Sequence, residues 1–437
     1  MRLYSTFGNP NFVCGYLIGA IFPAAALALT LRKRIRQIAC GLATALMLVA
    51  IAGTGSYGGW AALGVGVLVA SIIVWWGGRR AAQRRAEEKA GNAGSLRMAL
   101  APVWIGALCL VASVDQLLSS RIAGRVYLSR IGWQMFAEHP LLGSGWGTFQ
   151  LRFLDFQSRF LAAHPDWTRF WTNVLELHND LLQLLIETGL LGFAAFCWLL
   201  AKYGRQVWQA AGACESRTKI IWLGAASGGA TAILADSLVN FQFAIAPTLI
   251  LLFTFLAFPH LLGKEKDSPQ PKPRKKHRLF AGEQRVFLIR ALGAIIVTVF
   301  CAFLLVQTAQ RVLAERDYAL GLDFESRGDW AGAERVDRRG IARTPQLGKL
   351  HFALARVLYL QREYEPALAE AELAESTYSD SHLIVLKARI LDRMGRAQEA
   401  IASYRRALHL DPRLKTVQPD IDRLANTLQK PSAGQTH

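Results

Sequence analysis

Eight apolar runs limit the folds open to this chain of 437 residues more strongly than any other feature. A helix needs about 20 apolar residues to cross the roughly 30 Å hydrocarbon core of a bilayer. Because lipid offers no hydrogen-bond partners, the backbone of each spanning run has to be helical. We therefore predict an all-α, polytopic membrane protein. The predicted spans are residues 11–31, 38–54, 58–77, 98–114, 179–201, 220–241, 243–263 and 287–309.

The basic residues concentrate in four connections between these runs. They are residues 32–37, 79–97, 202–219 and 264–290. They hold 23 Lys and Arg against 6 Asp and Glu, which accounts for nearly all of the formal net charge of +18. Basic and non-basic connections alternate, as the positive-inside rule requires of cytoplasmic loops. The alternation places the loop 115–178 and everything after about residue 310 outside the cytoplasm, and it explains the charge without a nucleic-acid partner.

The connection after the seventh run is rich in proline and basic residues, and it reads KEKDSPQPKPRKKHR. Such a composition is typical of an extended linker. Because two spans flank it, we interpret residues 264–286 as a cytoplasmic linker close to anionic lipid. The run 287–309 then forms an additional transmembrane helix that carries the chain outside again.

The six cysteines are scattered along the chain without the spacing of a metal site. We predict that they pack as small apolar residues. The cysteines therefore predict no disulfide and no metal site, and we expect no cofactor.

The composition changes after about residue 310, where charged residues become frequent and the apolar runs stop. Three segments align: GDWAGAERV (328–336), EYEPALAEA (363–371) and RAQEAIASY (396–404). Their equivalent residues Trp330, Tyr364 and Ala397 are 34 and then 33 residues apart. Small residues recur within them at Ala333, Ala367 and Ala400. This pattern resembles the tetratricopeptide repeat, a helix–turn–helix unit. We predict an α-solenoid of about three repeats over residues 310–430, with a protein partner for its concave surface.

The outside loop 115–178 has the densest pattern of polar and aromatic residues. Arg121, Arg125 and Arg130 begin an amphipathic stretch, and arginines can clamp a phosphate group. Alternating glycines follow at Gly143, Gly145 and Gly147. Glycines at this density permit a tight loop whose N–H groups could face an anion, although they also make an ordinary turn.

A histidine, an asparagine and a carboxylate lie at the start of the next span. His178 titrates near neutral pH and can act as a base, or it is simply an interfacial side chain. Asn179 can cap the helix. Glu187 lies further into the same apolar run, where ionisable groups seldom occur without a function. These residues are our candidates for a binding or catalytic site.

Two motifs of the loop carry a resemblance to a known family. The segment RVYLSRIGWQMFAEHPLLGSGWGTF, followed by His178, Asn179, Gly189 and Gly192, resembles the O-antigen ligase and O-antigen polymerase superfamily. TFGNPNFVCGYL at 6–17 and TGSYGGWAALGVG at 54–66 resemble further segments of that family. The resemblance covers about residues 5–262, which predicts a membrane domain over residues 1–263.

The resemblance implies a GT-C-like, metal-independent membrane glycosyltransferase of the bacterial inner membrane. Such enzymes move a glycan from an undecaprenyl-diphosphate carrier to an acceptor hydroxyl on the periplasmic side. The acceptor is a lipid A core in the ligases, another glycan repeat unit in the polymerases and a protein in some relatives. By the same resemblance, His178 is the general base and Arg125 holds the diphosphate, with Arg130 as a second candidate.

Three departures from the family pattern stand out. Ser56–Tyr57 replaces the usual Ser-Arg pair, whose arginine also serves the diphosphate. In the stretch 235–247, Asp236 replaces a histidine and Asn240 replaces an aspartate. Only four predicted spans precede the loop, fewer than in family members, which predicts that the sequence is a fragment with spans missing ahead of Met1.

Two hypotheses of function follow. The first is a lipid-linked glycan ligase or polymerase that uses His178 and Arg125. The second is a catalytically impaired membrane scaffold whose repeat domain recruits partners of a polysaccharide assembly system. A transporter is a weaker alternative, because the spans ahead of the loop lack ionisable pathway residues.

Overall fold

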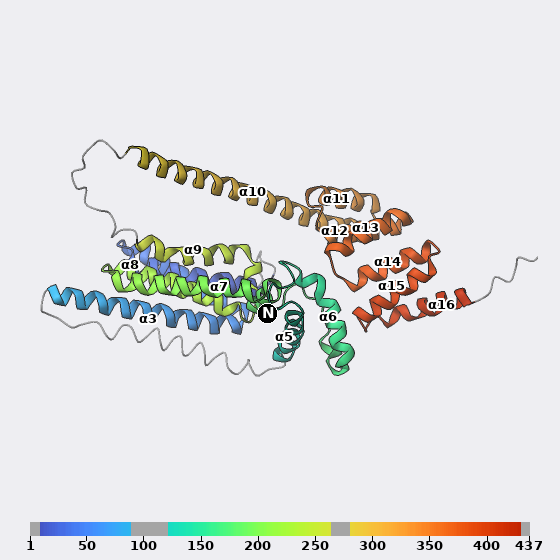
Figure 1. Cartoon of the computed structure of the whole chain (residues 1–437), viewed down its shortest axis with the longest axis horizontal. Helices are drawn as coiled ribbons and strands as arrows, with labels where there is room; N and C mark the ends of the chain where they lie inside the picture. The colour runs from blue at the N-terminus through green and yellow to red at the C-terminus, as the bar shows by residue number, and fades with distance from the viewer. Residues whose placement is uncertain (1–8, 89–120, 264–279, 430–437) are drawn as a thin grey trace, which may run out of the picture. The chain divides into compact units, whose positions relative to one another are not determined.

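The computed structural model describes residues 9–88, 121–263 and 280–429, and the regular elements in these ranges are all helices. The chain divides into two compact units (Figure 1). The first, which we call the membrane unit, contains Met1–Phe149 and Val174–Ser268. The second contains Gln150–Asn173 and Pro269–His437. The prediction of an all-α protein is thus confirmed for the described residues.

The membrane unit is a bundle of long apolar helices with two shorter elements at its polar end. Its elements are α1 (Pro10–Thr30), α2 (Arg34–Thr54), α3 (Tyr57–Glu88), α5 (Arg121–Glu138), α7 (Asp180–Ala213), α8 (Arg217–Asp236), η3 (Gln242–Ala244) and α9 (Ala246–Gly263). In the described residues, five helices are long and apolar enough to cross a membrane: α1, α2, α3, α7 and α8. The helix α9 is apolar but shorter.

The other predicted spans have different outcomes. Residues 98–114 lie outside the described residues. The run 243–263 corresponds to the shorter helix α9, and the run 287–309 lies within α10 (Phe280–Ser326). The helical membrane character is therefore supported, whereas the count of eight spans stays a prediction.

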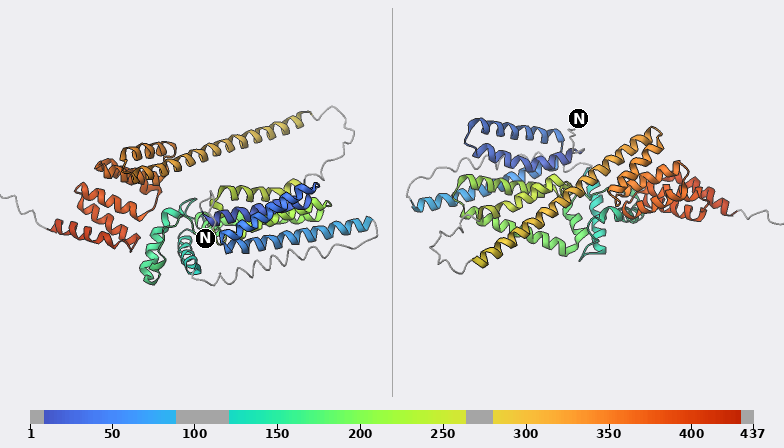
Figure 2. Two further views of the ribbon diagram at one scale, coloured as in Figure 1. Left: turned by 180° about the vertical axis from the view of Figure 1, so that it is seen from behind. Right: turned by 90° about the horizontal axis from the view of Figure 1, so that it is seen from above.

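Small residues allow the spans to pack closely. A Cβ added at Gly66 on α3 would lie 2.5 Å from the carbonyl oxygen of Gly228 on α8, and the reverse substitution would bring it within 2.7 Å of Gly66 O. Close approach of two backbones at small residues is a common way to pack helices in lipid. The core beside this contact includes Ile18, Phe22 and Leu63. In Figure 2, α1 and α2 form an antiparallel hairpin at the start of this bundle.

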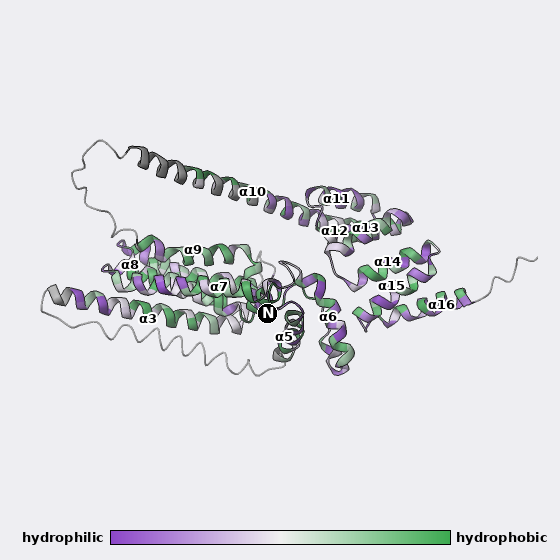
Figure 3. Ribbon diagram, in the orientation of Figure 1, coloured by the Kyte–Doolittle hydropathy of each residue, from purple (hydrophilic) through white to green (hydrophobic). Residues whose placement is uncertain are grey.

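The second unit consists of an N-terminal piece and a C-terminal array. The piece contains the helix α6 (Phe149–Ala163), whose first residue groups with the membrane unit, and η2 (Pro165–Phe170). The name C-terminal array is used here for α10 (Phe280–Ser326), α11 (Trp330–Arg343), α12 (Gly348–Leu360), α13 (Tyr364–Thr377), α14 (Ser381–Arg393), α15 (Ala397–Leu410), η5 (Lys415–Val417) and α16 (Gln418–Gln429). Figure 3 shows both hydrophilic and hydrophobic residues on its helices α11–α16.

The helix pairs of the array end in the same backbone geometry. Gly328, Arg362 and Gly395 have φ values of 75°, 70° and 76°, and each precedes the start of α11, α13 or α15 by two residues. The residue after each donates its N–H to a carbonyl five residues earlier, at 2.9–3.0 Å. This is the 6→1 bond of a Schellman helix end. The recurring turns agree with the predicted period, and assignment to the tetratricopeptide family stays a prediction.

The helix α10 differs from the predicted division of the chain. We expected a linker to residue 286, a span to residue 309 and the repeats from residue 310. A single helix instead begins at Phe280 and runs to Ser326, so both expected boundaries fall inside it (Figure 2). The apolar run and the first amphipathic stretch each favour a helix, and no proline or glycine pair separates them.

The grouping of residues 150–173 also differs from the expectation. We predicted that the whole loop 115–178 belongs to the membrane domain. The structure groups residues 121–149 and 174–178 with the membrane unit, but Gln150–Asn173 with the C-terminal array.

Candidate functional site

The candidate site lies at the N-terminal end of α7, where the chain enters the helix in a strained conformation. His178 has a φ of 60°, which few residues other than glycine adopt. Asn179 follows as the N-cap, and its side-chain oxygen accepts the N–H of Leu182 at 3.0 Å. The capping role expected for Asn179 is therefore present. Backbone strain at a non-glycine residue often marks a functional site.

The His178 ring lies in a partly buried, aromatic and positively charged environment. Its centroid is 4.7 Å from that of Phe241, with the rings edge to face, and Phe241 lies 5.0 Å from Phe12 in the same way. Burial lowers the pKa of His178, and the positive charge of Arg125 lowers that pKa further. Both effects disfavour the imidazolium ion. The ring is therefore neutral near pH 7, and one of its nitrogens can accept a proton.

A buried polar network lies on the other side of Phe241. The carboxylate of Asp236, at the end of α8, accepts hydrogen bonds from the side-chain amides of Asn240, at 2.8 Å, and Gln242. All three side chains are at most 1% exposed. Arg125 interacts electrostatically with Asp236 as well as with His178. We call these residues, with Arg125, His178 and Phe241, the His178 cluster.

Asp180 ties the cluster to α7. Its N–H donates to the carbonyl of Ser237 at 2.8 Å, and its carboxylate accepts the N–H of Phe243 at 3.0 Å. The connection between α8 and α9 is thereby bound to the first turn of α7. This holds Phe241 against His178.

The α1 and α2–α3 segments close the cluster from the other side. The hydroxyls of Thr54 and Ser56 lie beside the thiol of Cys14. A Cβ added at Gly15 would lie 1.9 Å from the Gln242 side chain, and one added at Gly59 would lie 2.1 Å from the Cys14 sulfur. The segments 9–17, 54–66 and 235–247, which are far apart in the sequence, thus meet at one end of the bundle.

The three loop glycines form a separate structure around a break in α7. Gly143, Gly145 and Gly147 all have positive φ, and so does Gly189, where α7 departs from helical geometry. Gly145 donates its N–H to Glu187 O at 3.0 Å, and the neighbouring Ser144 donates to Ile186 O at 2.9 Å. Pro140 O and Leu141 O accept the N–H groups of the two residues after Gly189. The loop therefore satisfies the backbone groups that the break exposes.

Glu187 belongs to this loop and not to the surroundings of His178. Its carboxylate is 6% exposed and accepts the backbone N–H groups of Gly147 and Phe149, the latter at 3.3 Å. The anion that these N–H groups face is thus a side chain of the protein itself. We expected only that the N–H groups of the glycine loop could face an anion, or that the glycines make an ordinary turn.

The three candidate arginines have different positions. All three are residues of α5, whose buried face carries Tyr127, Ile131 and Met135. Arg125 and Arg130 are exposed, and Arg125 is the one whose charge acts on His178 and Asp236. Arg121 starts the helix one turn before Arg125, and its side chain lies outside the described residues.

Sequence reasoning missed several residues of the site. Asp180, Phe241 and Gln242 were not among our candidates, and Asp236 was noted only as a departure from the family pattern. The carboxylates of Asp180 and Asp236 lie beside the ends of apolar runs and could have been found from the sequence, because ionisable groups at membrane helices rarely occur without a function. Phe241 and Gln242 carried no signal, since their role depends on contacts with residues far away in the sequence.

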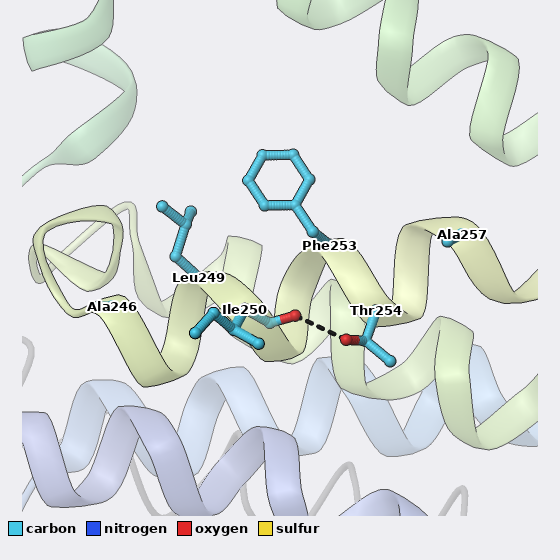
Figure 4. Close-up of a pocket in the computed structure, with 6 residues that line it drawn as sticks. All are labelled: Ala246, Leu249, Ile250, Phe253, Thr254 and Ala257. Carbon is cyan, nitrogen blue, oxygen red and sulfur yellow. Dashed lines mark hydrogen bonds between the residues drawn. The ribbon is translucent and has the colours of Figure 1, made fainter. Parts of the chain in front are cut away.

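A shallow apolar depression on α9 is unrelated to these residues. Its lining comes from one face of the helix: Ala246, Leu249, Ile250, Phe253, Thr254 and Ala257 (Figure 4). The Thr254 hydroxyl donates to the carbonyl of Ile250 at 2.8 Å. The depression offers no charged group, and an apolar helix face of this kind suits contact with lipid chains.

Comparison with known proteins identifies one related family. Residues 42–197 match the family model described as O-antigen ligase. The match covers less than half of the chain, and it supports a relationship of this segment to the O-antigen ligase superfamily, which is associated with polysaccharide biosynthesis. No significant match was found among curated proteins or solved structures. The matched segment includes Arg125, the glycine loop and His178.

Proposed function

We propose that this protein transfers a glycan from an undecaprenyl-diphosphate carrier to an acceptor hydroxyl at the periplasmic face of the bacterial inner membrane. The observation that carries the proposal is the position of His178 within a segment that matches O-antigen ligases. There a neutral, partly buried imidazole lies within the electrostatic reach of Arg125. The acceptor is a glycan, a lipid or a protein.

In the proposed reaction, the acceptor oxygen attacks the anomeric carbon of the carrier-bound glycan. The bond between that carbon and the phosphate oxygen breaks, and undecaprenyl diphosphate leaves with the bonding electrons. His178 takes the proton of the acceptor hydroxyl, as a general base does. Arg125, with Arg130 and Arg121 on the same helix, stabilises the negative charge of the leaving diphosphate.

The buried network supports this proposal by positioning the base. Asp180 binds the α8–α9 connection to α7, and the connection holds Phe241 against the His178 ring. A base whose ring is held in place has to be reoriented less before proton transfer. Asp236 keeps a negative charge or a hydrogen-bond acceptor close to Arg125, which helps to orient that side chain.

The experiment is a transfer assay with the full-length protein in bacterial membranes and a lipid-linked glycan donor. We expect His178→Ala to reduce transfer by at least about a hundredfold, the usual contribution of a general base. His139→Ala is the matched control, because His139 is an exposed histidine of the same loop outside the His178 cluster. Transfer by His178→Ala at the rate of the control would remove His178 from the mechanism.

A membrane scaffold is the second candidate, and one observation favours it. Ser56 lies beside Cys14, but Tyr57 follows it where family members carry an arginine. If the protein is a scaffold, His178→Ala is silent in cells. Removal of residues 313–437, which contain most of the C-terminal array, then abolishes polysaccharide assembly.

A further inference from the structure

Trp171 is bound at the edge of the C-terminal array. Its indole N–H donates to the carbonyl oxygen of Leu410, the last residue of α15, at 2.9 Å. The last carbonyls of a helix have no partner within the helix, so they are available to an outside donor. Trp171 comes from the loop, and Leu410 lies more than two hundred residues further along the chain.

Arg413 covers the same indole. Its guanidinium carbon is 3.6 Å from the centroid of the Trp171 ring, a close cation–π contact. The guanidinium also donates to both carboxylate oxygens of Asp411, at 2.9 and 3.1 Å, and Asp411 is 2% exposed at its side chain. The buried carboxylate thus fixes the plane of the guanidinium against the ring.

A second contact lies two residues after the tryptophan. The side-chain amide of Asn173 donates to the carboxylate of Asp380 at 3.2 Å. Asp380 is the N-cap of α14, and its other oxygen accepts the N–H of His382 at 2.7 Å. The same oxygen that binds Asn173 also accepts the hydroxyl of Tyr378 at 3.1 Å.

The array residues that make these contacts lie in equivalent connections of two successive helix pairs. Asp380 lies in the connection between α13 and α14, and Leu410, Asp411 and Arg413 lie in or next to the connection between α15 and α16. Because successive helices are antiparallel, alternate connections lie on the same edge of a stack of pairs. Residues 171–173 therefore run across two adjacent helix pairs.

Contacts with α6 hold the segment that leads to Trp171 in one conformation. Phe160 on α6 contacts the rings of His164 and Trp167, and Trp167 contacts Phe170. The buried side chain of Gln157 accepts the N–H of Thr172 at 3.2 Å. An extended segment that is held in one conformation loses less entropy when it binds.

We propose that the edge of the array formed by the α13–α14 and α15–α16 connections is a recognition site for a tryptophan-bearing extended peptide, and that its occupant is residues 171–173 of the same chain. The array thus binds the loop that precedes His178. This assigns the array an internal partner in place of the external one expected from the sequence, and it does not depend on glycan transfer.

Two features favour the chain's own loop over another protein. The indole ring, the guanidinium and the Asp411 carboxylate form one continuous set of contacts, so Arg413 is already oriented by its neighbour for a ring at this position. The segment is also part of the same polypeptide, which gives it a high effective concentration at the site.

The experiment uses the full-length protein in membranes, with the photo-reactive amino acid p-benzoylphenylalanine in place of the exposed Asn173. Illumination is expected to link this position to residues 378–382, identified by mass spectrometry. The product is expected to keep the mobility of a monomer on a denaturing gel. A product of twice the mass, or one joined to another protein, would overturn the assignment to the same chain.

Substitutions test the anchor. Trp171→Ala and Arg413→Ala are each expected to lower the cross-linking yield at least about fivefold, since each removes the cation–π contact and one also removes a hydrogen bond. The control is Arg405→Ala, an exposed arginine of α15, which is expected to stay within about twofold of the parent. Trp171 is outside the array, so its replacement removes no contact between the helices of the array. An unchanged yield in Trp171→Ala would overturn the proposal.

Discussion

At the scale of single residues, the electrostatic link between Arg125 and His178 is the most informative feature of the candidate site. Burial and the Arg125 charge both lower the pKa of His178 below its ordinary value of 6.5. A base with a lowered pKa stays unprotonated to more acidic pH. The rate therefore begins to fall at a lower pH than it would with a free histidine as the base. The position of that limb reports on the environment of the ring.

The first prediction concerns this limb. Replacing Arg125 with Gln removes the positive charge, so the pKa of His178 rises and the loss of activity on acidification begins at a higher pH. The measurement is the pH dependence of glycan transfer in the parent and in Arg125→Gln. Arg130→Gln is the control, and we expect its acid limb to match that of the parent. A limb that does not move in Arg125→Gln would contradict the link.

Only some of the site residues could be predicted from the sequence. His178, Asn179 and Arg125 could be proposed because they lie in local motifs with a recognisable spacing. Asp180, Phe241 and Gln242 could not, because their roles arise where the α8–α9 connection meets α7 and α1. No local pattern in the sequence encodes which distant segments meet.

At the scale of structural elements, the contact between the glycine loop and the break in α7 has a strict steric requirement. A Cβ added at Gly143 would lie 2.4 Å from the backbone of Glu187, and one added at Gly189 would lie 2.3 Å from Leu141 O. Backbone atoms cannot move aside as a flexible side chain can. The loop and the break therefore depend on each other.

The second prediction compares two glycines of this loop. Gly143 and Gly147 have nearly equal φ values of 73° and 75°, but a Cβ at Gly147 would meet nothing within 4 Å. Gly147→Ala should cost about 1–2 kcal/mol through the left-handed backbone alone. Gly143→Ala should cost at least about 3 kcal/mol, because a backbone clash is added to that strain. Thermal unfolding in detergent measures the difference, and equal losses in both variants would contradict it.

Elements show another limit of sequence reasoning. Hydropathy predicted a span that ends near residue 309, and charge predicted that a different domain begins there. The apolar run and the charged stretch after it do differ in composition. A helix nevertheless continues through such a change when no proline or glycine pair interrupts it. The helix α10 therefore runs through the change in composition to Ser326. Composition indicates the surroundings of a helix and does not indicate where the helix ends.

At the scale of the whole molecule, the distribution of basic residues predicts the orientation of the chain in the membrane. Cys214 lies in the basic connection between α7 and α8, which the positive-inside rule places in the cytoplasm. The exposed Arg405 lies in the C-terminal array, which the same rule, applied to the eight predicted spans, predicts to be periplasmic.

The third prediction tests this orientation in cells whose outer membrane has been made permeable and whose inner membrane is intact. A maleimide that does not cross membranes should label an Arg405→Cys variant and leave Cys214 unlabelled. Disruption of the inner membrane should then permit labelling of Cys214, which serves as the internal control. Labelling of Cys214 in the intact cells would reverse the orientation.

The continuity of α10 has a geometric consequence for the C-terminal array. A helix of 47 residues is about 70 Å long at 1.5 Å per residue. Each residue inserted into such a rod moves everything beyond it along the axis and turns it by about 100°. The rotation of the later helices of the array about the α10 axis, measured from the first turn of α10, is therefore set by the number of residues in that helix. A change of seven residues, close to two full turns, would restore that rotation, whereas a change of two would turn the binding edge to the opposite side of the axis.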